Sequence, residues 1–100
     1  MEMENVEPKP MTGSVPRVRV EFYGLARQRA GCAGVSVEAA TLGAALLAVE
    51  AQCPELRPTR NGAPSPEYLL SIGGTRFTAD LTASLTDGDC LLILGADAGG

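Results

Sequence analysis

The sequence predicts a two-layer α+β domain, in which one main helix packs across one face of a mixed sheet of about four to five strands. Three features indicate this class: an alternating strand pattern near the start, one helical segment in the middle, and a continuous apolar strand near the end. The chain has 100 residues, enough for one domain, and its 45% hydrophobic content can supply a single core. We expect the domain to span 17–95, after a leader at 1–16 and before a flexible tail at 96–100.

The first element is predicted to be a strand at 17–23. The leader before it is expected to be flexible, because it combines three prolines and three glutamates with almost nothing to bury. In the segment 17–23 (RVRVEFY), apolar and charged residues alternate with the period of a half-buried strand. A helical start after Gly24 is expected to break at Gly31, and the β-branched run at 35–37 is expected to pair with the first strand as a hairpin.

The one clear helix is predicted at 42–52. Thr41 is suited to cap its first turn. Pro54 ends it, because the residue before a proline disfavours the α conformation. Apolar residues recur at helical spacing along one side: Leu42, Leu46, Val49 and Cys53.

The second half of the chain is predicted to hold three strands. The segment 57–66 contains three prolines and an Asn-Gly pair, so it is expected to be a long loop. The apolar segment CLLIL is expected to be a central strand, covered on both faces or on one face by a partner. The predicted strands are 68–72, 75–78 and 90–94, with turns at Gly73-Gly74 and 86–89.

This element order suggests which strands are neighbours. The first and last long strands are both apolar, so we expect them to pair at the centre of the sheet. A mixed sheet with that pairing and one helix across it has the β-grasp architecture.

Composition excludes several kinds of site. The chain has no histidine, which removes Ser-His-Asp and Cys-His catalysis and every histidine-ligated metal site, so no metal is expected. It has four aromatic residues, a net charge of −4 and no basic stripe, so nucleic-acid binding is not expected. Arg27, Arg29 and Arg76 are the candidates for a small basic patch, although solvated surface arginines are commoner.

The cysteines and the chain start favour a cytoplasmic protein. Three cysteines at 32, 53 and 90 form no C-x-x-C pair and no even-numbered disulfide framework. Cys53 and Cys90 are expected in the core, and Cys32, in a glycine-containing loop, is the one worth testing for reactivity. No signal peptide and no apolar run long enough to span a membrane are visible, so no membrane association is expected.

The C-terminal segment is the part of the chain best suited to take part in a reaction. Gly99-Gly100 follows the last core strand closely, so the domain should carry an extended tail ending in a carboxylate. Glycines lack a Cβ, and such a tail can therefore enter a narrow slot in another enzyme. The protein has no evident general base or nucleophile cluster of its own, which suits a carrier more than an enzyme.

Several segments resemble the MoaD/ThiS family of ubiquitin-like sulfur carriers, of which the molybdopterin synthase small subunit is one. The most specific likeness is the Leu-x-Asp-Gly-Asp turn at 85–89, followed by an apolar strand and the terminal Gly-Gly. The family often has Pro-Pro after the last strand, where this chain has Gly95-Ala96-Asp97-Ala98. The other matching segments are VRVEFYGLARQRAG at 18–31, TLGAALLAVEAQCPEL at 41–56 and SIGGTRF at 71–77.

The resemblance implies a role for each part of the tail. Gly100 would be adenylated and then converted to a thiocarboxylate that donates sulfur in cofactor biosynthesis. Gly99, Ala98 and Asp97 would thread into the partner, and Leu92 and Leu94 are candidates for a docking patch beside the tail. The protein would bind no cofactor itself.

The resemblance also implies partners. These are a MoeB/ThiF-like adenylating enzyme of the ubiquitin-activating type that uses ATP, a sulfur donor, and a larger synthase (a MoaE-like subunit or a thiazole synthase). Molybdenum cofactor biosynthesis is the favoured pathway. The alternatives are a ThiS-like carrier for the thiamin thiazole or another sulfur-transfer pathway, a ubiquitin-like protein modifier, and a plain β-grasp binding module.

Overall fold

Residues 15–96 are described by the computed structural model, so the expectations for 1–14 and 97–100 lie outside the described residues. The described elements, in chain order, are β1 (Arg17–Tyr23), α1 (Leu25–Ala30), β2 (Gly34–Glu38), α2 (Leu42–Gln52), β3 (Thr59–Arg60), β4 (Ala63–Pro64), β5 (Tyr68–Ile72), β6 (Arg76–Phe77) and β7 (Cys90–Gly95).

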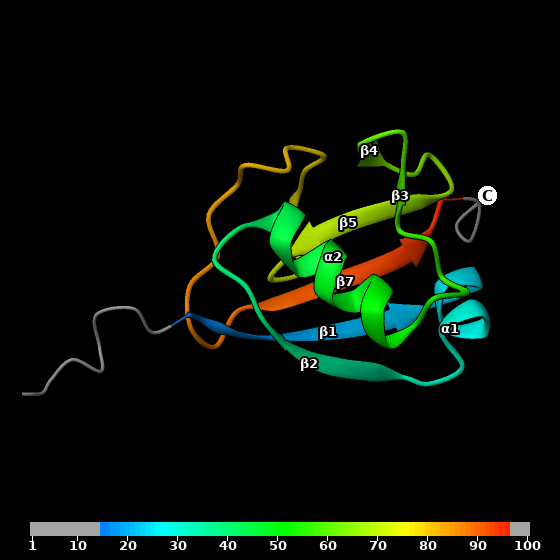
Figure 1. The fold of residues 1–100 in the computed structure, drawn as a ribbon, viewed down its shortest axis with the longest axis horizontal. Helices are drawn as coiled ribbons and strands as arrows, with labels where there is room; N and C mark the ends of the chain where they lie inside the picture. Colours follow the sequence, from blue (N-terminus) through cyan, green and yellow to red (C-terminus); the bar gives the residue numbers. More distant parts are fainter. Residues whose placement is uncertain (1–14, 97–100) are drawn as a thin grey trace, which may run out of the picture.

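Five strands form one mixed sheet in the order β2-β1-β7-β5-β6 (Figure 1). β1 and β7 run parallel at its centre, with Val20 opposite Leu91 and Phe22 opposite Ile93. β2 pairs antiparallel with β1, and β5 pairs antiparallel with β7. The expected central pairing and the β-grasp fold class are therefore confirmed.

The helix α2 covers one face of this sheet, and its predicted bounds and cap are confirmed (Figure 1). The Ala44 amide donates to the Thr41 hydroxyl at 3.2 Å, which satisfies one of the free N–H groups of the first turn. The predicted apolar stripe is buried along its length, together with Val18, Val20 and Phe22 of β1. Leu47 points the other way and is 65% exposed.

Two predictions for the connections need correction. The segment 57–66 is not only a loop, because β3 and β4 form a small antiparallel hairpin within it. Asn61 and Gly62 at its tip both have positive φ, 55° and 77°, as a tight hairpin turn of this kind requires. The predicted return strand at 75–78 is shorter than expected and consists of Arg76–Phe77.

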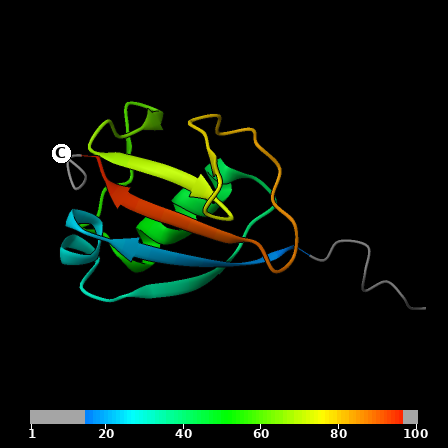
Figure 2. The same ribbon diagram turned by 180° about the vertical axis from the view of Figure 1, so that it is seen from behind.

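The short helix α1 confirms the expected helical start after Gly24 and its break at Gly31. It runs over six residues and ends at Gly31, whose φ of 79° lies in the left-handed region that favours glycine. Figure 2 shows the sheet from behind, with α1 beside the end of β1 where β7 also ends. α1 therefore lies at the end of the sheet from which the tail leaves.

Ser71 of β5 is a fully buried polar residue whose hydroxyl has no hydrogen-bond partner in the described part of the chain. Ser71→Ala is expected to raise the free energy of unfolding by about 1 kcal/mol, because an unsatisfied buried polar group is removed with little change in shape. Denaturant titration measures this, with the exposed Ser84→Ala as the control. A loss of stability for Ser71→Ala would show that the hydroxyl is hydrogen-bonded in solution.

Candidate functional site

The base of the tail is held by the residue just before β5. β7 ends at Gly95, and the amide of Ala96 donates to the carbonyl of Glu67 at 2.7 Å. Gly100, Gly99, Ala98 and Asp97, the site residues expected from the sequence, lie outside the described residues. The structure therefore defines the surroundings from which the tail departs, at the end of the sheet beside α1 (Figure 1).

The sheet face opposite α2 carries apolar side chains beside the tail. Leu92 and Leu94 of β7 are half-buried there, because alternate residues of the strand (Leu91 and Ile93) point into the core. Across the sheet, Leu94 lies between Tyr23 of β1 and Leu69 of β5. The structure thus places both predicted docking residues on the open face; their role in docking stays a prediction.

Exposed apolar residues extend this face toward its β6 edge. Leu69 is 46% exposed and Phe77 is 61% exposed. A shallow groove of about 290 Å³ is lined by both of them. Apolar surface of this kind, gathered on one sheet face, is typical of a protein-docking surface.

A polar group borders the same face along β1. The carboxylate of Glu21 accepts hydrogen bonds from the Tyr23 hydroxyl at 2.6 Å and from Arg19 Nε at 3.0 Å. These two bonds lower the pKa of Glu21. The Arg27 guanidinium lies 5.5 Å from the centre of the Tyr23 ring. Tyr23 is therefore held in place at the rim of the docking face.

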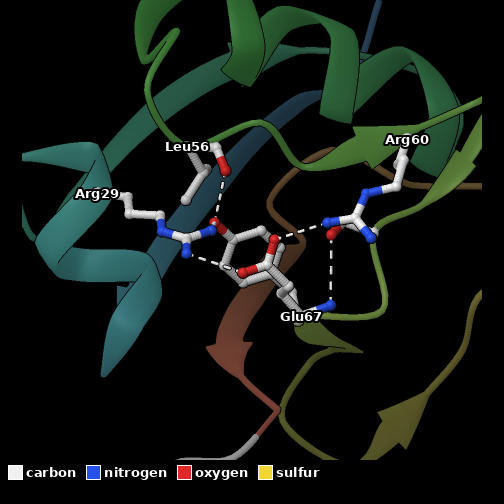
Figure 3. Close-up of polar contacts among 6 residues, drawn as sticks. Arg29, Leu56, Arg60 and Glu67 are labelled. Atoms are coloured by element: carbon white, nitrogen blue, oxygen red, sulfur yellow. Dashed lines mark hydrogen bonds and ion pairs between the residues drawn. The ribbon is translucent and has the colours of Figure 1, made fainter.

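A second polar cluster surrounds the base of the tail. Figure 3 shows Glu67 between two arginines: its Oε1 pairs with Arg29 at 2.8 Å, and its Oε2 pairs with Arg60 at 2.8 Å. Arg29 also donates to the Tyr68 hydroxyl at 3.1 Å, and that hydroxyl donates to the carbonyl of Leu56. This network links α1, the residues after α2, the β3–β4 hairpin and β5.

Three residues of this network, Arg29, Arg60 and Glu67, line a cleft of about 520 Å³, which we call the arginine cleft. The predicted basic patch of three arginines is therefore wrong, because only Arg29 lines this cleft. Arg27 lies over the Tyr23 ring, and Arg76 belongs to β6, at the other end of β5. The sequence analysis missed the other two arginines of the cleft, Arg57 and Arg60. The feature of the sequence that could have indicated the position of Arg60 is the Asn-Gly turn at 61–62. This turn folds the β3–β4 hairpin back toward β5. The lining of the cleft is Arg29, Glu55, Arg57, Thr59, Arg60 and Glu67.

The ion pairs of Glu67 predict a dependence of stability on pH. The hydrogen bond from Arg29 lowers the pKa of Glu67. The resulting stabilisation is present above the ordinary carboxyl pKa and is lost as the pH falls through the lowered one. Glu67→Gln should therefore destabilise the protein at pH 7 and cost much less at pH 3. Denaturant unfolding at both pH values measures this, with Glu50→Gln as control. A cost that does not depend on pH would contradict the ionic origin.

The cysteines offer little chemistry within the described residues. Cys53 is buried and Cys90 is half-buried, and burial raises the pKa of both thiols. Cys32 is exposed, as expected for its loop. No group of three or more potential metal ligands occurs among residues 15–96, and no helix of that part is long and apolar enough to cross a membrane.

The sheet order and the helix across it define the β-grasp fold of ubiquitin-like proteins. The resemblance to the MoaD/ThiS type is confirmed by the solved structures that this fold matches. Small archaeal modifier protein 1 from Haloferax volcanii is 23% identical, with a TM-score of 0.73 over 84% of this chain and 99% of that one.

Two further structures are similar. A chain of the BexX/CysO complex of Amycolatopsis orientalis is 25% identical, with a TM-score of 0.69 over 83% of this chain and 99% of that one. A protein assigned as subunit 1 of the molybdopterin converting factor of Pyrococcus furiosus is 16% identical, with a TM-score of 0.66 over 80% of this chain and 97% of that one. No family model matches the sequence, and no curated protein does.

Proposed function

We propose that this protein is a sulfur carrier that is activated at the carboxylate of Gly100 and supplies sulfur for molybdopterin. The observation that carries the proposal is the short separation between the central strand and Gly99-Gly100. The central strand β7 stops at Gly95, so Gly100 follows the core after a short segment that ends in two glycines. The fold shared with carriers and modifiers supports the same function.

The proposed chemistry uses the terminal carboxylate. An adenylating enzyme of the MoeB/ThiF type would join this carboxylate to AMP from ATP and release pyrophosphate. A sulfur donor would then displace AMP, which leaves a thiocarboxylate on Gly100. The tail, with Asp97, Ala98 and Gly99, would next enter a MoaE-like subunit, where the sulfur passes to the cofactor precursor. In this proposal the partner enzymes supply the catalysis. The carrier and its partners are cytoplasmic.

The apolar sheet face supports docking to such partners. Leu92 and Leu94 lie on the strand that leads into the tail, so an enzyme holding the tail would also meet this face. The neighbour from Amycolatopsis orientalis was solved in a complex with a second protein, which fits a carrier that works by binding.

Intact mass spectrometry of the untagged protein tests the proposal. The protein is incubated with ATP, a sulfur donor and each candidate adenylating enzyme. We expect a mass gain equal to the exchange of one oxygen for sulfur, absent when Gly100 is deleted. No gain with any of these enzymes would contradict the proposal.

A second candidate is a ubiquitin-like protein modifier. The similarity to a small archaeal modifier protein favours it, because both functions begin with activation of a terminal carboxylate. Conjugates joined through Gly100 to lysines of other proteins would identify it. A ThiS-like carrier would instead support thiazole synthesis by a thiazole synthase.

A further inference from the structure

The backbone of Arg57 adopts an unfavourable conformation. Its φ is 53°, and Arg57 and Asn61 are the two non-glycine residues with positive φ in the described part of the chain. Asn61 is explained by its hairpin turn, for which asparagine is well suited. Arginine has no such advantage, and Pro58 follows it, which favours an extended conformation for the residue before. A glycine at position 57 would be easier to accommodate.

The side chain of Arg57 gives a reason for retaining arginine at this position. It lines the arginine cleft with Arg29 and Arg60. Those two arginines already occupy the two carboxylate oxygens of Glu67. Within residues 15–96, no carboxylate forms an ion pair with Arg57. Backbone strain at a residue of this kind is found more often at binding sites than elsewhere.

The charge of the cleft limits what it can bind. Its lining carries three arginines and two glutamates, a formal charge of +1, in a chain whose net charge is −4. A single carboxylate matches this charge better than the phosphates of a nucleotide do. The cleft also adjoins the tail, because Glu67 binds the amide of Ala96 through its carbonyl and the two arginines through its side chain.

We propose that the arginine cleft binds an acidic side chain of the adenylating enzyme and thereby orients the carrier as its tail enters the active site. This inference rests on the proposed function. Arg57 would form the new ion pair, while Glu67 holds Arg29 and Arg60 in place beside it. The cleft is a local cationic site on an acidic protein, so it would set the orientation of an acidic partner surface.

Two substitutions of Arg57 test this inference in the full-length protein. Arg57→Gln removes the charge, and Arg57→Gly also relieves the backbone strain. We expect both to raise the KM of the adenylating enzyme for the carrier by about fivefold or more, with little change in kcat and a weaker dependence of KM on salt. Arg57→Gly should keep or raise the Tm, so the lost affinity cannot come from unfolding. Arg76→Gln, at the other end of β5, is the matched control.

The outcomes separate this inference from the proposed function. If wild-type protein is adenylated and the Arg57 variants have its KM, the cleft proposal is overturned and the carrier function stands. If no enzyme adenylates the wild type, the carrier function fails, and an NMR titration tests the cleft directly. Amide shifts of Thr59 and Arg60 with an oligoglutamate peptide, reduced in Arg57→Gln, would support the cleft. Shifts with ATP alone, or with neither probe, would overturn it.

Discussion

Leu46→Ala is expected to lower the free energy of unfolding by about 2–5 kcal/mol, the usual cost of removing a leucine side chain from a packed core. Leu46 is fully buried on the inner side of α2, and it belongs to the cluster that joins the helix to the central strands. Equilibrium unfolding in urea or guanidinium chloride measures the change. A domain of this size is stabilised by only about 5–15 kcal/mol, so this variant can lose a large part of its folded population.

The adjacent leucine provides a matched control. Leu47 lies on the same helix and is 65% exposed, so Leu47→Ala makes the same chemical change without a cavity. Its free energy of unfolding should change by no more than about 0.5 kcal/mol. Equal losses for the two variants would mean that α2 does not pack through the side that contains Leu46.

Adding one residue after Gly100, or replacing Gly100 with a bulky residue, is expected to abolish the ATP-dependent mass gain. A side chain at the end of the tail would block entry into the narrow slot of an adenylating enzyme, and an added residue would move the reacting carboxylate. The thermal midpoint should stay at the wild-type value, because the core ends with β7.

Measuring the Tm and the ATP-dependent mass gain of the same variants shows what the tail does. Loss of the mass gain at constant Tm would assign Gly100 to the reaction. A parallel loss of both would show that the tail packs on the domain. An unchanged mass gain in the extended protein would contradict activation at the terminal carboxylate.

Much of the fold could be predicted because its signals are local. The alternating residues of 17–23 gave the first strand, and Thr41 and Pro54 gave the two ends of the main helix. The Gly-Gly turn at 73–74 separates β5 from β6 as expected. In each case a few adjacent residues set the backbone conformation.

The features that were missed depend on residues far apart in the chain. The two-residue strands β3 and β4 are too short to show any periodicity. The arginine cleft combines Arg29 with Arg60 and Glu67, and no spacing rule relates positions on a helix, in a hairpin and in a turn. The buried hydroxyl of Ser71 depends on what covers it, which the sequence of β5 does not indicate.

The parallel pairing of β1 with β7 has a consequence for how the protein is made. The two central strands are separated by most of the chain, so a growing polypeptide lacks the middle of its sheet until residues 90–95 have left the ribosome. A topology with such a long-range contact is expected to fold slowly compared with a helical bundle of similar length.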